Sequence, residues 1–189
     1  MPRRHPELWY ALLSIAAVTA IYLVAYQQAG GFPRASGLVG HGIGVTGFIL
    51  MLMTETLYSI RKRLTDARWG STAGWLRFHI VTGLVGPYMV LLHTAMRFNG
   101  LAGVATLLTV VVVMSGVVGR YVFTTVPRVV DELGPTASES DLEQLESRLA
   151  KQRRGLATWY AVHVPLTWVL FATALVHAGA ALLYATLQR

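Results

Sequence analysis

Four histidines come in two pairs with the same internal spacing. His79 and His93 are fourteen residues apart, and so are His163 and His177. At about 100° per residue, fourteen helical residues end about 40° short of four full turns, so both members of a pair share one helix face. The helical rise of about 21 Å separates them by most of the thickness of a bilayer. Such imidazoles are candidate metal ligands at two depths.

The composition places these histidines in lipid. Hydrophobic residues make up 54% of the 189-residue chain and charged residues 13%, whereas a soluble domain carries about 25% charged residues. The mean hydropathy is +0.51. There is no cysteine, which excludes disulfides, thiolate-held iron–sulfur clusters, zinc sites of the Cys type and covalently attached c-type haem.

Five apolar segments are long enough, or nearly so, to cross a bilayer, which takes about 20 helical residues. The sequence therefore predicts an all-α integral membrane protein, a five-span transmembrane helix bundle that forms one domain over residues 1–189. The expected spans are 8–26, 38–58, 75–96, 101–123 and 158–187.

The basic residues predict the orientation of the bundle. Thirteen of the 16 lysines and arginines fall on the side of the N-terminus, and only Arg34, Arg97 and Arg189 fall on the other side. The excess of positive charge on cytoplasmic loops then places the N-terminus in the cytoplasm and the C-terminus outside. We expect the bacterial inner membrane. The net charge of +7 meets anionic lipid headgroups, and no nucleic-acid partner is needed to explain it.

Residues 124–154 form the only long polar segment, a cytoplasmic loop between spans four and five. Ser140-Asp141-Leu142-Glu143 is typical of a helix start with a capping box. Leu145 and Leu149 continue the apolar side of a short amphipathic helix. We expect this helix to lie against the membrane or the bundle; docking of a redox partner is the alternative.

The two histidine pairs suit haem better than another metal. Spans three and five run in the same direction, so His79 can face His163 near the cytoplasmic side, and His93 can face His177 near the outer side. Two imidazoles from neighbouring helices at one depth are the axial ligands of a six-coordinate haem iron. We therefore predict two non-covalent b-type haems. Zinc or copper is the competing interpretation, but no carboxylate or thiolate completes a shell.

Further residues near the pairs are candidates for contacting the cofactor. Gly83 and Gly86, on the face between His79 and His93, remove side chains that would collide with a porphyrin ring. Three arginines are candidate partners for haem propionates, or else anchors at the membrane interface: Arg77 and Arg120 near the inner side, and Arg97 near the outer side.

The second span carries a glycine face that predicts close helix packing, against another helix or a haem: Gly37, Gly40, Gly44 and Gly47. The formal GxGxxG within this stretch follows no strand and does not indicate dinucleotide binding. His41 is a candidate contact for a propionate or a quinone, or a simple interfacial residue. Glu55 serves either proton uptake or interfacial anchoring.

With these histidines and this topology, the chain resembles the ferric reductase-like transmembrane domain of ferric reductases and NADPH oxidases. The resemblance implies an inner and an outer haem that carry electrons from a cytoplasmic flavin to an acceptor outside. That family usually has a sixth span and a domain for FAD and NADPH, which this chain lacks, so the expected donor is a separate protein or a quinol. The chain is also similar to cytochrome b of the bc complexes, where the ligands occupy the second and fourth spans.

The functional hypothesis is a di-haem b-type cytochrome that moves electrons across the membrane as a subunit of a larger redox complex. Its partners would be other redox subunits or a separate electron donor protein. It would be an electron-transfer subunit rather than a complete enzyme, because the spans hold no nucleophile, triad or paired catalytic carboxylate. One alternative is a quinone-reactive cytochrome b anchor of a peripheral dehydrogenase. Another is a haem-free transport or scaffold protein whose histidines only join helices.

Overall fold

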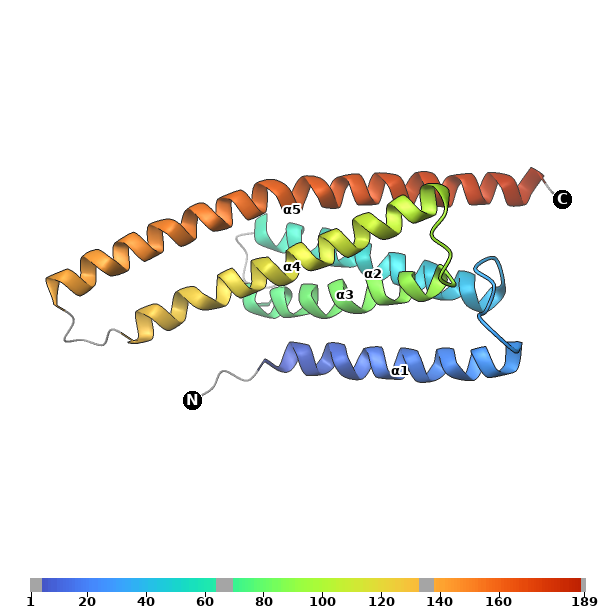
Figure 1. The fold of residues 1–189 in the computed structure, drawn as a ribbon, viewed down its shortest axis with the longest axis horizontal. Helices are drawn as coiled ribbons and strands as arrows, with labels where there is room; N and C mark the ends of the chain where they lie inside the picture. The colour runs from blue at the N-terminus through green and yellow to red at the C-terminus, as the bar shows by residue number, and fades with distance from the viewer. Residues whose placement is uncertain (1–4, 64–69, 133–137, 188–189) are drawn as a thin grey trace. The chain divides into compact units, whose positions relative to one another are not determined.

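The computed structural model describes residues 5–63, 70–132 and 138–187, and within these ranges it contains helices and no strand. The helices are α1 (Pro6–Ala29), α2 (Leu38–Arg63), α3 (Thr72–His93), α4 (Gly100–Glu132) and α5 (Glu139–Leu187) (Figure 1). The expectation of an all-α protein is confirmed. All five helices are also long and apolar enough to cross a membrane, as the sequence predicts.

Local signals explain both ends of α1, the end of α2 and the start of α3. Pro6 occupies the first turn of α1, where its missing N–H costs nothing, and Gly30 ends α1 in the left-handed conformation with φ 68°. Ser71 caps α3 by accepting a hydrogen bond from the Gly74 N–H at 3.1 Å. The buried Arg61 near the end of α2 donates to the Gly70 carbonyl at 3.0 and 2.8 Å, which fastens α2 to the start of α3.

Helices α4 and α5 are longer than the predicted spans. The α4 helix continues past residue 123 to Glu132, and the predicted short amphipathic helix is the first part of α5 rather than a separate element. Gly155 alone is too weak a breaker to separate this part from the span that follows. Leu145 and Leu149 are half-buried while Glu143 and Glu146 are exposed, which fits one apolar side. The predicted location of this segment on the membrane surface stays a prediction.

The chain divides into two compact units, residues 1–106 and 107–189. In the first unit, α3 packs against both α2 and α1. The α1 and α3 helices run parallel, since the Thr19 and Tyr88 hydroxyls lie 2.6 Å apart and Tyr22 donates to the Leu92 carbonyl at 3.4 Å. The α2 and α3 helices run antiparallel, and their closest approach involves glycine on both sides.

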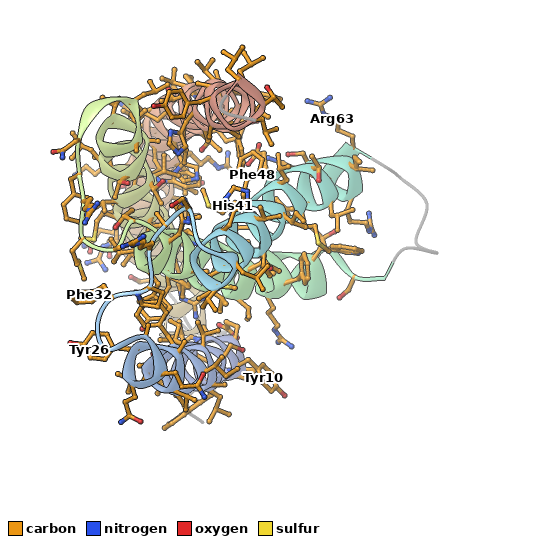
Figure 2. The ribbon with its side chains drawn as sticks, turned by 90° about the vertical axis from the view of Figure 1, so that its right-hand side faces the viewer. Tyr10, Tyr26, Phe32, His41, Phe48 and Arg63 are labelled. Carbon is orange, nitrogen blue, oxygen red and sulfur yellow. The ribbon has the colours of Figure 1, made fainter. Side chains whose placement is uncertain are left out.

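Few large apolar side chains are buried, and most point outward, as expected where the solvent is lipid. In the first unit the buried apolar residues are Ala11, Tyr22, Met51, Val85 and Met89. Outside this small core, Tyr10 and Tyr26 project from α1 and His41 from α2 (Figure 2).

Candidate haem-ligand site

The two histidines of α3 both face α2. His79 lies in the second turn of α3 and His93 is its last residue, and the helix between them is continuous although it contains Pro87. The His79 Nδ1 lies 3.1 Å from the Thr54 carbonyl oxygen, and the His93 Nδ1 lies 2.8 Å from the Gly40 carbonyl oxygen. The prediction that this pair shares a helix face is therefore confirmed.

These contacts fix the tautomer of both imidazoles. A carbonyl oxygen only accepts hydrogen bonds, so Nδ1 must carry the proton and donate it. The lone pair of each neutral ring is then on Nε2. This is the state in which a histidine binds a metal through Nε2, with its ring orientation set by the bond from Nδ1.

The spacing of the histidines is matched on the opposite helix. Gly40 and Thr54, whose carbonyls accept the two bonds, are fourteen residues apart, as are His79 and His93. Midway between them, Gly47 of α2 meets Gly86 of α3: a Cβ on Gly47 would lie 2.8 Å from the Gly86 oxygen, and one on Gly86 would lie 2.9 Å from the Gly47 oxygen. The antiparallel helices α2 and α3 thus have a glycine contact at the centre and a hydrogen-bonded imidazole on either side of it.

The prediction of close helix packing is confirmed for Gly44 and Gly47, which meet α3, whereas Gly37 and Gly40 meet the Arg34 backbone instead of another helix. Gly44 lies against the His93 ring, where an added Cβ would be 2.6 Å from Cγ. On α3, a Cβ on Gly83 would lie 3.4 Å from the Thr54 Cγ2. The space that Gly83 and Gly86 leave on this side is therefore taken by α2, and their predicted role beside a porphyrin ring stays a prediction.

Each α3 histidine also has a ring neighbour on α2. The Tyr58 ring centroid lies 5.0 Å from that of His79, and the exposed His41 lies 6.4 Å from His93 in an edge-on arrangement. Glu55 is half-buried and accepts a hydrogen bond from Ser59 at 3.4 Å. None of these contacts assigns His41 or Glu55 the predicted quinone, propionate or proton-uptake role.

In the second unit, His163 is buried on α5 and its Nδ1 contacts the Ser115 Oγ of α4. The Ser115 hydroxyl donates its own proton to the Val112 carbonyl at 3.1 Å, so its oxygen accepts from His163 Nδ1–H. The tautomer is therefore the same as on α3. Trp159 stacks on the imidazole with a centroid distance of 4.8 Å and an angle of 21°.

His177 lies fourteen residues further along the same unbroken α5 and is half-buried. Among the described residues, no side chain or carbonyl hydrogen-bonds its ring. His79 and His93 belong to the first unit, whereas His163 and His177 belong to the second. The pairing of His79 with His163 and of His93 with His177 therefore stays a prediction.

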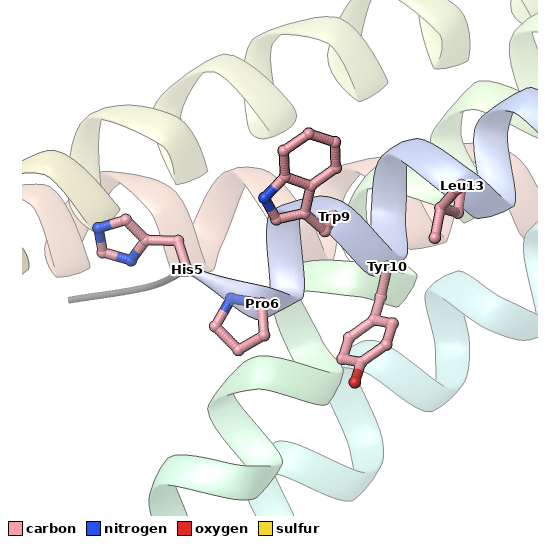
Figure 3. A pocket seen from close by; sticks show the side chains of 5 residues that line it. All are labelled: His5, Pro6, Trp9, Tyr10 and Leu13. Carbon is pink, nitrogen blue, oxygen red and sulfur yellow. The ribbon is translucent and has the colours of Figure 1, made fainter. Parts of the chain in front are cut away.

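Of the other predicted contacts, Arg77 lies near the start of α3, Arg97 lies between α3 and α4, and Arg120 lies within α4. Arg77 and Arg97 are exposed and Arg120 is half-buried, and their proposed bonds to haem propionates stay predictions. A hollow at the start of α1, lined by His5, Pro6, Trp9, Tyr10 and Leu13, contains none of the predicted ligands (Figure 3).

The sequence reasoning missed Ser115 and Trp159 as neighbours of His163. Ser115 follows the run Val110-Val111-Val112-Val113-Met114, and one hydroxyl in so apolar a stretch is the signal that would have singled it out. The carbonyl acceptors on α2 had no such signal, because every residue carries a backbone carbonyl.

Comparison with protein-family models, with curated proteins and with solved structures finds no match to this chain. The resemblance to the ferric reductase-like transmembrane domain therefore rests on the four histidines and the order of the spans. It remains a hypothesis about function.

Proposed function

We propose that the protein is a di-haem b-type cytochrome that carries single electrons across the membrane as a subunit of a larger redox system. The observation that supports this most is the common state of His79, His93 and His163. Each donates its Nδ1 proton to an oxygen of a neighbouring helix and keeps Nε2 as the basic nitrogen.

The residues fit haem on chemical grounds. An axial ligand must be a neutral imidazole whose free lone pair points in a defined direction, and a bond from the other nitrogen supplies both properties. Bonds of this kind also join helices in membrane proteins that hold no cofactor, where each contributes about 0.6 kcal/mol on average. The haem content of the purified chain separates these two roles.

In this proposal His79 and His163 hold the inner haem, and His93 and His177 hold the outer one. Bound haem supplies reversible one-electron chemistry at its iron. The chain's own residues provide the ligands, bury them in apolar surroundings and set the distance between the inner and the outer ligand pair. Fourteen residues of helix fix that distance at about 21 Å along the helix axis.

The orientation follows from the basic residues, with the N-terminus in the cytoplasm and the C-terminus outside the bacterial inner membrane. The inner pair then faces a cytoplasmic donor, and the outer pair faces the acceptor side. The donor would be another redox subunit, a separate protein or a quinol. Reduction of the haems by quinol alone would identify the protein as a quinone-reactive anchor.

Single histidine substitutions test the proposal. We expect His79→Ala and His163→Ala to lose the same haem and keep the other, and His93→Ala and His177→Ala to lose the second. His5→Ala is the matched control, because His5 is also a histidine of this chain but precedes α1 and belongs to neither predicted ligand pair. It should retain both haems. Unchanged haem content in all four ligand variants would refute the proposal, whereas loss of different haems from His79→Ala and His163→Ala would refute the pairing.

A further inference from the structure

The surroundings of His163 differ from those of His79 and His93 in one respect. On α3, backbone carbonyls accept the Nδ1 protons, and no substitution can remove them. His163 instead donates to a side chain, the hydroxyl of Ser115. Substitution of Ser115 can therefore remove this hydrogen bond while the proposed ligand His163 stays in place.

Trp159 adds a second constraint on the same ring. It lies one helical turn before His163 on α5, stacks on the imidazole and donates its Nε1 proton to the Ser115 carbonyl at 2.7 Å. Ser115 thus accepts two hydrogen bonds from α5, one at its hydroxyl and one at its carbonyl. The two hydrogen bonds and the stacked indole together fix the position of the His163 ring along α4 and the orientation of its plane.

Gly119 of α4 leaves room for the indole of Trp159, and Gly116 lies beside the His163 ring at ordinary contact distance. A Cβ on Gly119 would overlap the indole of Trp159, and one on Gly116 would lie 3.7 Å from the His163 Cε1. Gly119 is buried beneath the indole. Residues 115–119 of α4 therefore form the surface against which the His163 and Trp159 rings pack.

We propose that Ser115 and Trp159 are positioning residues for His163, which hold its proton on Nδ1 and fix its ring plane so that Nε2 is ready to bind the haem iron. The inference rests on the proposed function. Removing the bond that orients a metal-ligating histidine costs about 10–100-fold in metal affinity. Because only His163 depends on Ser115, the loss is confined to the haem that His163 holds.

The experiment measures the release of haem from the purified full chain to an excess of apomyoglobin, which captures free haem. Wild type, Ser115→Ala and Trp159→Leu are compared, and His163→Ala identifies which phase of release belongs to the inner haem. Thr173→Ala is the matched control, because its hydroxyl on α5 donates only to the Val169 carbonyl of its own helix.

We expect Ser115→Ala to accelerate the inner phase by about 10–100-fold and to leave the outer phase unchanged. Trp159→Leu should accelerate the same phase, and Thr173→Ala should release both haems as wild type does. The electron paramagnetic resonance signal of the inner haem alone should change in Ser115→Ala, because the orientation of its axial imidazole changes.

The inference is overturned if wild type holds two haems and Ser115→Ala releases both at wild-type rates, or both faster by the same factor. A wild-type protein that binds no haem would overturn the proposed function itself, so the two failures are distinguishable.

Discussion

Substitution of Gly47 by alanine should weaken the contact between α2 and α3. The added Cβ would lie 2.8 Å from the Gly86 oxygen, 2.9 Å from the Met89 Cβ and 3.1 Å from the Val90 nitrogen. Carbon atoms pack best at about 3.5–4.0 Å, so the helices must separate by several tenths of an ångström. Two of the three atoms belong to the backbone and cannot rotate away.

Overpacking a close contact costs about 1–3 kcal/mol, and the better helix propensity of alanine returns up to about 1 kcal/mol. We therefore expect Gly47→Ala to lower the free energy of unfolding by about 1–2 kcal/mol. Gly42→Ala is the matched control, since Gly42 lies on the same helix and an added Cβ there meets nothing within 4 Å. It should be neutral or slightly stabilising.

The assay is reversible unfolding in mixed detergent micelles, followed by far-UV circular dichroism. The two variants should differ by about 2 kcal/mol, which is about a 30-fold change in the unfolding equilibrium. Equal stability of Gly47→Ala and Gly42→Ala would show that α2 and α3 do not approach through Gly47. The account of how α2 orients His79 and His93 would then fail with it.

Two more predictions concern the attachment of α1 and the orientation of the bundle. Tyr88→Phe removes the hydrogen bond to Thr19 and should lower the free energy of unfolding by about 0.6 kcal/mol. Tyr184→Phe, at an exposed tyrosine, should leave the free energy of unfolding unchanged. Equal effects of the two substitutions would show that the bond between Tyr88 and Thr19 contributes nothing. Because the chain has no cysteine, a single cysteine at the exposed Ser36 or Ser140 reports topology. An impermeant maleimide should label Ser36→Cys in intact spheroplasts and Ser140→Cys only after permeabilisation, and the reverse pattern would contradict the N-in orientation.

The five long apolar helices could be predicted because a helix that crosses a membrane needs about 20 consecutive apolar residues, and runs of that length are visible in the sequence. Their ends were harder to predict. The polar residues 139–154 still favour a helix, so α5 continues through them from Glu139 to Leu187 and no separate element forms. Hydropathy marks where a helix leaves the lipid, which differs from where the helix ends.

The shared face of His79 and His93 followed from helical periodicity, and the glycine face of α2 followed from small residues at spacings of three and four. The sequence could not show the register in which the histidine face of α3 packs against the glycine face of α2. The acceptors at Gly40 and Thr54 are backbone atoms, and only the three-dimensional contact of α2 with α3 selects these two carbonyls. Ser115 is a partner of His163 because α4 and α5 run antiparallel here, with Gly116 beside His163 and Gly119 beside Trp159, and the sequence does not show this register.

The measurement that tests the central claim most directly is the visible spectrum of the chain purified in mild detergent, oxidised and then reduced with dithionite, together with a pyridine haemochrome count. The account predicts sharp b-type bands and two haems per chain. A folded, colourless protein that takes up no added haem would contradict it, and the four histidines would then serve only to join helices.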